Sequence, residues 1–289
     1  MIKYLLILII LFTITSHSQK SDFENVVYNV GLGSFGSAIG AVINKKENEK
    51  SGKVFLKGLW QGSIGGALIY GSKKIVSEIP KTKHIEYNWG AKLVNAAGVS
   101  IIENAARNRD FWELWHFNLG FNRFEFNTKD KFKFTYKIRP ISLALTLGSA
   151  INRKAEWSLM LQSGEVIFSA SKLRHNENAE AYALGQAVVL KDNSIFSIEQ
   201  VLAHEFIHIY QYNDYNFINS YFTNTISDFR NKSSLINTLS NYIYWDLHYP
   251  IVAGLYEIER RSNTSNSDNF FEREARFYSP DELNSIFNY

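Results

Sequence analysis

Cysteine is absent from this chain of 289 residues. A chain without thiols forms no disulfides and carries out no thiolate chemistry, so a zinc site in it must be built from histidine and carboxylate side chains. A large excess of charge of one sign is absent too, because the formal net charge is +3 and no basic stripe stands out. The sequence therefore gives no indication of a nucleic-acid partner.

A long hydrophobic segment is also missing from the N-terminus. The apolar run at residues 4–14 follows Lys3 and is too short for a permanent membrane span. Small and polar residues come next, with Ser16 and Ser18 placed as in a signal-peptide cleavage site. Residues 1–18 are therefore predicted to be a signal peptide, and no cysteine follows to carry a lipid anchor. We expect an exported protein in the periplasm or outer envelope of a bacterium.

Residues 19–107 are rich in glycine and are predicted to be helical. The segments with most small residues lie at 26–43, 54–72 and 91–106. Small residues three and four positions apart let helices pack closely, in membranes especially. Lys57 and Gln61 interrupt the second segment, which favours a helical layer of a soluble protein. Both interpretations stay open, so membrane association through residues 26–107 is one expectation.

From residue 108 the pattern changes to aromatic and β-branched residues mixed with polar ones, which is typical of strands. Residues 132–138 alternate strictly between apolar and polar side chains, as a half-buried strand does. The candidate strands lie at 111–127, 131–139, 141–149, 157–161, 166–170 and 181–191. Residues 218–244 and 251–260 are predicted to be helices. We therefore expect an α+β fold.

An HExxH motif occupies residues 204–208, in an apolar run that is predicted to be a helix beginning near Ser197. Two histidines four positions apart lie on one face of a helix, so His204 and His208 can bind the same metal ion. Glu205 lies between them and is placed to take a proton from an attacking water. Both faces of this helix are largely apolar, and buried histidines need a polar partner. The less specific interpretation is a pair of core histidines satisfied by hydrogen bonds.

A third ligand is expected from residues 269–278, which are predicted to form a short helix. Glu272 and Glu274 are the candidates, and they project about 160° apart on a helix, so only one can face the metal. The small Ala275 beside Glu272 allows a close approach to the HExxH helix. Glu272 can also be explained as part of a capping box begun by Asn269.

The two motifs together resemble those of the gluzincin metallopeptidases, in which HExxH is followed at some distance by Glu-x-x-Ala-Asp. The resemblance covers residues 197–212 and 269–278. It implies that Glu272 is the third ligand, although some gluzincins place the ligand directly before the alanine, which favours Glu274. Where the family carries Asp, this chain has Arg276. Any role of that Asp is therefore missing or is supplied by another residue.

The resemblance also implies a zincin-like domain over residues 108–289. Its strands are expected in 108–191 and its metal-binding helices in 197–289. In gluzincins a residue between the two motifs often stabilises the oxyanion, and the candidates here are His248, Tyr249 and Tyr256. Three further histidines lack ligand spacing and are expected to be surface or core residues: His84, His116 and His175.

We therefore expect a zinc-dependent metallopeptidase that acts on protein or peptide substrates. Zn²⁺ is expected to be bound by His204, His208 and Glu272, with Glu205 as the base. A strand directly before the metal-binding helix is the order expected of a zincin, where peptide binds by strand addition. The alternative is an envelope protein of zincin fold with a structural or binding role and no turnover. A third interpretation is a β-rich surface protein in which HExxH occurs by chance.

Overall fold

The computed structural model describes residues 21–173, 179–262 and 269–279. The predicted signal peptide at residues 1–18 and His175 lie outside the described residues. Helices and two β-sheets confirm the expected α+β class. Helix accounts for 61% and strand for 14%, so the molecule is more helical than the predicted strands at 108–191 suggested.

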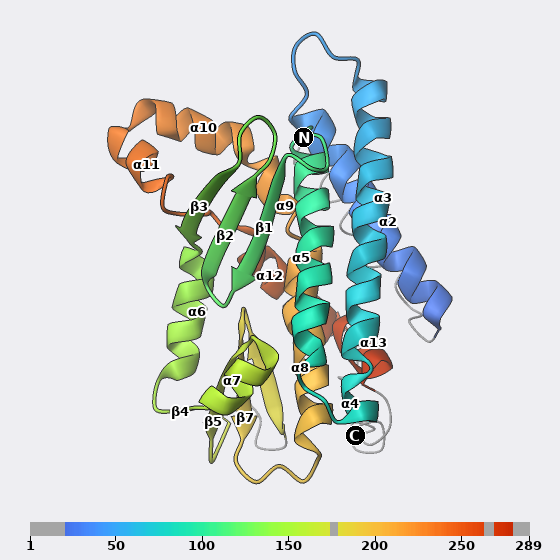
Figure 1. Ribbon diagram of the computed structural model, residues 1–289, viewed down its shortest axis with the longest axis vertical. Helices are drawn as coiled ribbons and strands as arrows, with labels where there is room; N and C mark the ends of the chain where they lie inside the picture. The colour runs from blue at the N-terminus through green and yellow to red at the C-terminus, as the bar shows by residue number, and fades with distance from the viewer. Residues whose placement is uncertain (1–20, 174–178, 263–268, 280–289) are drawn as a thin grey trace.

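Three long helices form the N-terminal part of the molecule, in blue to green in Figure 1. They are α2 (Asp22–Ile43), α3 (Ser51–Val76) and α5 (Tyr87–Ala106), with the short α4 (Ile79–Thr82) before α5. Glycine sets the distance between α2 and α3, because a Cβ on Gly62 would lie 2.2 Å from the carbonyl oxygen of Gly33. A side chain at this position would therefore force the two backbones apart.

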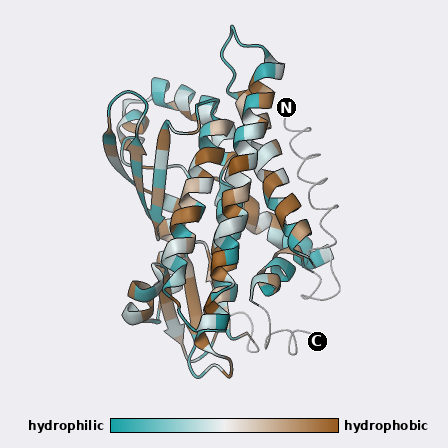
Figure 2. Ribbon diagram, turned by 45° about the vertical axis from the view of Figure 1, so that its right-hand side comes forward, coloured by the Kyte–Doolittle hydropathy of each residue, from teal (hydrophilic) through white to brown (hydrophobic). Residues whose placement is uncertain are grey.

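Among the described residues, α2 is the one helix that is long and apolar enough to cross a membrane, and half of its apolar window is buried. Figure 2 shows apolar segments along the long helices, and Val27, Trp60 and Ile64 are exposed on them. Asn29 and Gln61, in contrast, are buried. These helices therefore carry polar groups into the protein interior and expose apolar side chains on the surface.

Two small sheets follow the N-terminal helices. The first has the order β1-β2-β3 and is formed by β1 (Leu114–Leu119), β2 (Asn122–Asn127) and β3 (Lys133–Ile138). The second has the order β4-β5-β7-β6 and is formed by β4 (Lys154–Ala155), β5 (Val166–Ala170), β6 (Ala181–Leu184) and β7 (Ala187–Lys191). β5 and β7 run parallel, whereas β6 runs antiparallel to β7. β6 is therefore an edge strand.

Two of the predicted strands are hairpins. Residues 111–127 contain β1 and β2, and residues 181–191 contain β6 and β7. The chain reverses at Gly120 and Gly185, whose φ angles are +55° and +63°. Such angles favour glycine because it has no Cβ to clash with the backbone. These glycines are the sequence signal for the two turns.

The strand predictions at residues 141–149 and 157–161 are wrong, because these segments form α6 (Pro140–Ala150) and α7 (Trp157–Ser163). Pro140 stands in the first turn of α6, where its fixed φ suits a helix and its missing N–H is not needed. The Asp246 carboxylate accepts hydrogen bonds from the amides of Ile141 and Ser142. A residue far away in sequence therefore caps this helix.

The C-terminal part is helical, but the predicted helix at residues 218–244 is broken. It contains the short helices α9 (Ile218–Tyr221), α10 (Thr223–Lys232) and α11 (Ser234–Leu239). The chain then leaves the helix, and Ile243 pairs with Ile138 at the end of β3. The helix predicted at 251–260 lies within α12 (His248–Ser262), and the last predicted helix is α13 (Phe270–Tyr278).

The HExxH motif lies on α8 (Ile198–Asp214), which runs behind α5 in Figure 1. One core cluster joins Leu202 and Phe206 of α8 to Val76 of α3 and Val188 of β7. A second cluster includes side chains from α2, α3, α5, α12 and α13. The glycine-rich helices therefore share a hydrophobic core with the helix that carries the motif.

Candidate metal centre

α8 brings the two histidines of the motif to one place. Ser197 precedes this helix as its N-cap, as predicted, but its side chain makes no capping hydrogen bond. His204 and His208 lie one turn apart, and their Nε2 atoms are 3.2 Å from each other. Apolar residues around α8 exclude water from much of the helix, since Ala203, Phe206 and Ile207 are fully buried. The histidines are thus held in a low-dielectric region, where charged groups interact strongly.

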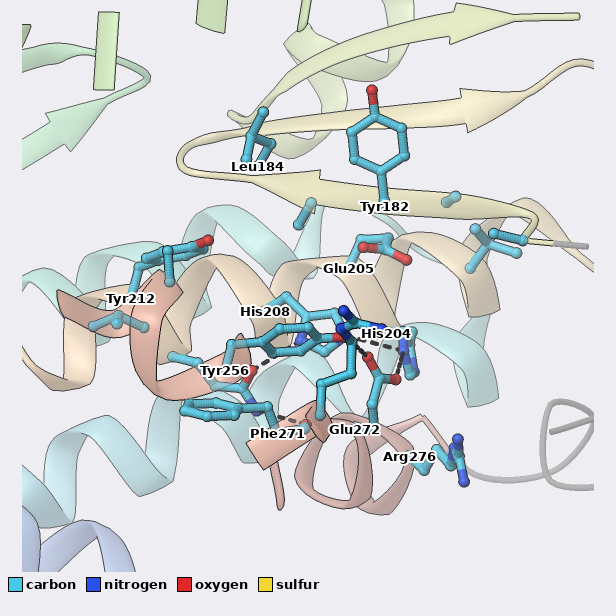
Figure 3. A pocket seen from close by; sticks show the side chains of 18 of the residues that line it. Tyr182, Leu184, His204, Glu205, His208, Tyr212, Tyr256, Phe271, Glu272 and Arg276 are labelled. Atoms are coloured by element: carbon cyan, nitrogen blue, oxygen red, sulfur yellow. Dashed lines mark hydrogen bonds and ion pairs between the residues drawn. The ribbon is translucent and has the colours of Figure 1, made fainter. Parts of the chain in front are cut away.

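α13 brings Glu272 to the same place. The Asn269 side chain caps this helix by accepting from the amides of Phe271 and Glu272. The Glu272 carboxylate points towards α8, with Oε2 3.4 Å from Nε2 of His204 and Oε1 3.6 Å from Nε2 of His208. Figure 3 shows the three side chains converging. One ligand atom from each residue lies within 4.8 Å of the others, so the group can hold a metal ion.

The spacing between the two imidazole nitrogens and the Glu272 carboxylate suits a tetrahedral ion. Bonds of about 2.0–2.2 Å to a tetrahedral zinc ion place neighbouring ligand atoms about 3.3–3.6 Å apart. The two imidazole nitrogens lie 3.2 Å apart, Nε2 of His204 lies 3.4 Å from Oε2 of Glu272, and Nε2 of His208 lies 3.6 Å from Oε1. The carboxylate thus offers an oxygen to each imidazole at a distance that suits one tetrahedral ion, and two imidazoles with one carboxylate are a suitable donor set.

The far nitrogen of each imidazole has its own hydrogen-bond partner. Nδ1 of His204 lies 3.2 Å from Oγ of Ser279, and that hydroxyl donates to the Ala275 carbonyl. The hydroxyl proton is thus already used, so Ser279 accepts from Nδ1 of His204, which leaves Nε2 unprotonated. Nδ1 of His208 lies 2.8 Å from Oε1 of Gln211. Both imidazoles therefore turn Nε2 towards Glu272.

Glu272 and His208 form an ion pair in the metal-free site. Burial lowers the pKa of His208, but the Glu272 carboxylate beside it raises this pKa to about 9. Burial acts to raise the pKa of Glu272, and the two histidines outweigh it, so this pKa lies well below its ordinary value. A positive charge therefore sits among the three ligand atoms at neutral pH even without a metal.

Tyr256 of α12 holds the carboxylate from a third direction. Its hydroxyl donates to Oε1 of Glu272 over 2.8 Å. Burial and the charge of Glu272 raise the pKa of Tyr256, so the phenol stays protonated at neutral pH. Of the three residues predicted as oxyanion candidates, Tyr256 is the one that lines the cleft. His248 is buried against Asn219, and Tyr249 contacts Arg139.

Glu205 lies beside the cluster and faces the cleft (Figure 3). The residue is 5% exposed, and within the described chain its Oε2 atom has no hydrogen-bond partner. Burial raises the pKa of this carboxyl, although a hydrogen bond from the Ala183 backbone lowers it. A buried carboxylate with one unused oxygen and a raised pKa is suited to accepting a proton.

The other two residues of the second motif lie elsewhere. Glu274, the alternative ligand, is fully buried and pairs with Lys73, 2.7 Å away. Arg276, which stands where the gluzincin pattern has Asp, points away from the three ligand side chains (Figure 3). Among the remaining histidines, His84 is exposed and His116 is buried beside Ser100.

A cleft of about 750 Å³ lies between β6 and the helices α8, α12 and α13. Ala181 and Ala183 of β6 pack against the core, and their small size lets the strand approach Glu205. Tyr182 and Leu184 point away from the ligand side chains (Figure 3). Among the described strands, β7 alone pairs with β6. The outer edge of β6 therefore borders the cleft.

No known protein family, curated protein or solved structure matches this chain. Reasoning from the sequence did not identify Ser279 or Lys73 as part of this region. Ser279 lies seven positions after Glu272 and directly follows the end of α13 at Tyr278, and this spacing was a weak signal for its contact with His204. Lys73 had no such signal, because nothing in its local sequence sets it apart from other lysines.

Proposed function

We propose that this protein is a zinc-dependent metallopeptidase of gluzincin type that hydrolyses peptide bonds. The observation that carries the proposal is the triangle formed by Nε2 of His204, Nε2 of His208 and the Glu272 carboxylate. The two nitrogens lie 3.2 Å apart, and they lie 3.4 and 3.6 Å from different oxygens of the carboxylate, which suits a tetrahedral zinc site. The HExxH spacing and the position of Glu205 beside this triangle agree with it.

The chemistry divides between the ion and the protein side chains. Zinc held by two imidazoles and a carboxylate supplies a Lewis acid that polarises a carbonyl group and lowers the pKa of water. Glu205 takes the proton of the attacking water on its unpartnered oxygen and passes it to the leaving amine. Tyr256 keeps its own proton and donates it to Glu272, which it holds in place. To donate to an oxyanion that forms beside it, the hydroxyl would turn away from Glu272, since it has only one proton.

The cleft suggests how a substrate binds. The outer edge of β6 offers backbone hydrogen-bonding groups to an extended peptide, which adds as a further strand. Apolar residues such as Leu173, Val252 and Phe271 line much of the cleft. We therefore infer that the substrate is an extended segment with apolar side chains next to the scissile bond. Export to the bacterial envelope is part of the proposal and rests on the sequence of residues 1–18.

The decisive variant is Glu205→Gln. It removes the base but no ligand, so we expect about one zinc per chain, as in the wild type, and loss of hydrolysis of an unfolded protein such as casein by at least about 100-fold. Glu199→Gln is the matched control, because it makes the same change on α8 at a residue that does not line the cleft. It should keep both zinc and activity.

Two outcomes would contradict the mechanism. Full activity of Glu205→Gln would remove Glu205 from it. A wild-type protein that binds zinc but cleaves nothing in a broad peptide library would favour the alternative, a zincin-fold envelope protein with a structural or binding role. If neither the wild type nor His204→Ala binds zinc at neutral pH, the HExxH motif has no metal-binding function.

A further inference from the structure

A buried ionic cluster lies behind the metal centre. It consists of Lys73 of α3, Asp214 of α8 and Glu274 of α13, and is called the Lys73 cluster below. Nζ of Lys73 lies 2.6 Å from Oδ2 of Asp214 and 2.7 Å from Oε1 of Glu274. None of the three side chains is more than 2% exposed. Breaking a buried ion pair is strongly unfavourable, so the cluster fixes three helices relative to one another.

Gln211 connects the Lys73 cluster to the metal centre. Its Nε2 donates to the Phe271 carbonyl over 2.8 Å and to Oε2 of Glu274 over 2.9 Å. Turning the amide round would bring its oxygen against these two acceptors, so its orientation is fixed. Oε1 of Gln211 therefore faces Nδ1 of His208, 2.8 Å away, and accepts its proton. Nε2 of His208 is then free for the metal.

The chain of contacts also reaches α2. Oδ1 of Asn29 accepts from Nζ of Lys73 over 3.0 Å. The close crossing of α2 and α3 makes this contact possible, because a Cβ on Gly66 would lie 2.4 Å from the carbonyl oxygen of Asn29. Glycine at this crossing thus lets Asn29 approach Lys73.

We propose that Lys73, Glu274 and Gln211 form an orienting chain that holds His208 as its Nδ1-protonated tautomer. The packing of α2 and α3 against α8 and α13 thereby sets the metal affinity of the site. These are positioning residues, since none of them supplies a ligand atom. The inference rests on the metal centre of the proposed function. Hydrogen-bond partners of metal ligands typically change metal affinity about 10- to 100-fold when they are replaced.

Two single substitutions break the chain at one link. In Glu274→Gln, an amide nitrogen of residue 274 faces Nε2 of Gln211. The Gln211 amide then turns and presents its nitrogen to Nδ1 of His208. Gln211→Glu sets two carboxylates against each other. Each single variant is expected to bind zinc about 10- to 100-fold more weakly than the wild type in competition with a chelator.

The double variant Gln211→Glu/Glu274→Gln exchanges the two groups and restores the chain. The new carboxylate accepts from His208 and from the new amide, and the new amide oxygen still accepts from Lys73. Because the Phe271 carbonyl loses its donor, we expect the double variant to bind zinc more tightly than either single variant but more weakly than the wild type. In nitrogen NMR of the metal-free proteins, at a pH high enough for His208 to be neutral, the ring proton should lie on Nδ1 in the wild type and the double variant but not in Glu274→Gln.

Glu165→Gln is the matched control, because Glu165 also forms a buried pair with a lysine, Lys92, at 2.6 Å, away from the metal centre. It should lower the unfolding temperature without changing zinc affinity. If the wild type binds zinc and the single variants bind it equally well, the orienting chain is wrong while the metal centre stands. The orienting chain is also wrong if the double variant folds without metal but binds zinc no more tightly than the two single variants. If the wild type binds no zinc, both the metal centre and the orienting chain are wrong.

Discussion

At the residue scale, the site depends on which nitrogen of each histidine is free. Ser279 accepts from His204, and Gln211 faces Nδ1 of His208. These two contacts orient both imidazoles, so Arg276 in place of the Asp of the gluzincin pattern does not leave them without support. The imidazoles of this candidate metal site are therefore oriented without that Asp.

Replacing Glu272 and Glu274 by alanine should have two different effects, one on zinc affinity and the other on stability. Glu272→Ala removes a ligand atom, so we expect a loss of zinc affinity well beyond the roughly 100-fold of a supporting residue. Glu274→Ala leaves Lys73 and Gln211 without an acceptor and should lower the free energy of unfolding of the metal-free protein by about 2–5 kcal/mol. Chelator competition and chemical denaturation measure the two effects. If Glu274→Ala loses more zinc than Glu272→Ala, the assignment of the third ligand is wrong.

Zinc binding should release a proton, because His208 binds metal only as the neutral imidazole. Its pKa of about 9 in the metal-free site means that it is protonated between pH 6.5 and 8.5. Zinc affinity should therefore rise with pH, by about tenfold per unit until pH 9. Calorimetry in two buffers of different ionisation enthalpy should count about one proton released at pH 7.5. A count near zero would contradict the ion pair between His208 and Glu272.

At the element scale, close approaches place the functional groups. Glycine lets α2 and α3 touch, and alanine lets β6 approach Glu205. α8 lies between these elements and receives contacts from both sides. The cleft thus has a strand on one side and helices on the other.

Two glycines of α3 offer a matched test of the close approach. Gly62→Ala would place a Cβ 2.2 Å from the Gly33 carbonyl oxygen, whereas a Cβ on Gly71 meets nothing within 4 Å. Gly62→Ala should lower the free energy of unfolding by about 1–3 kcal/mol through overpacking. Gly71→Ala should raise it by about 0.5–1 kcal/mol, because alanine loses less entropy in a helix. Urea denaturation of both variants checks this, and equal effects would mean that α2 and α3 do not cross at Gly62.

At the scale of the whole molecule, the N-terminal helices are joined to the rest of the protein by buried polar side chains. α2 and α3 contribute Asn29 and Lys73 to a buried polar network with α8 and α13. Inserting α2 and α3 into a bilayer would separate these groups and leave charges unpaired. Their exposed side chains, such as Val27, Trp60 and Ile64, are apolar, which favours contact with a membrane surface.

We therefore expect peripheral association of the full-length protein with membranes. Sodium carbonate should release the protein from an envelope fraction, because its buried polar groups keep the helices folded against α8. Replacing Trp60 with Ser should weaken sedimentation with lipid vesicles, while Lys45→Ser, in the turn after α2, serves as a control on charge. Retention of the wild type until detergent is added would show that residues 26–107 insert.

The sequence alone determined the local features of this protein. The HExxH spacing placed His204 and His208 on one helical face, and the glycine pattern predicted close helices, because both depend on a regular repeat of 3.6 residues. The predicted strand at 132–138 corresponds to β3. These features are readable because neighbouring residues decide them.

The tertiary structure decided what distant residues do together. It turned residues 141–149 into a helix through Asp246, and it brought Glu272 rather than Glu274 to the histidines. It also placed Lys73 behind His208 through contacts between helices far apart in sequence. Burial makes such polar contacts strong and exclusive, and no local pattern contains the pairing, so only the packed molecule shows it.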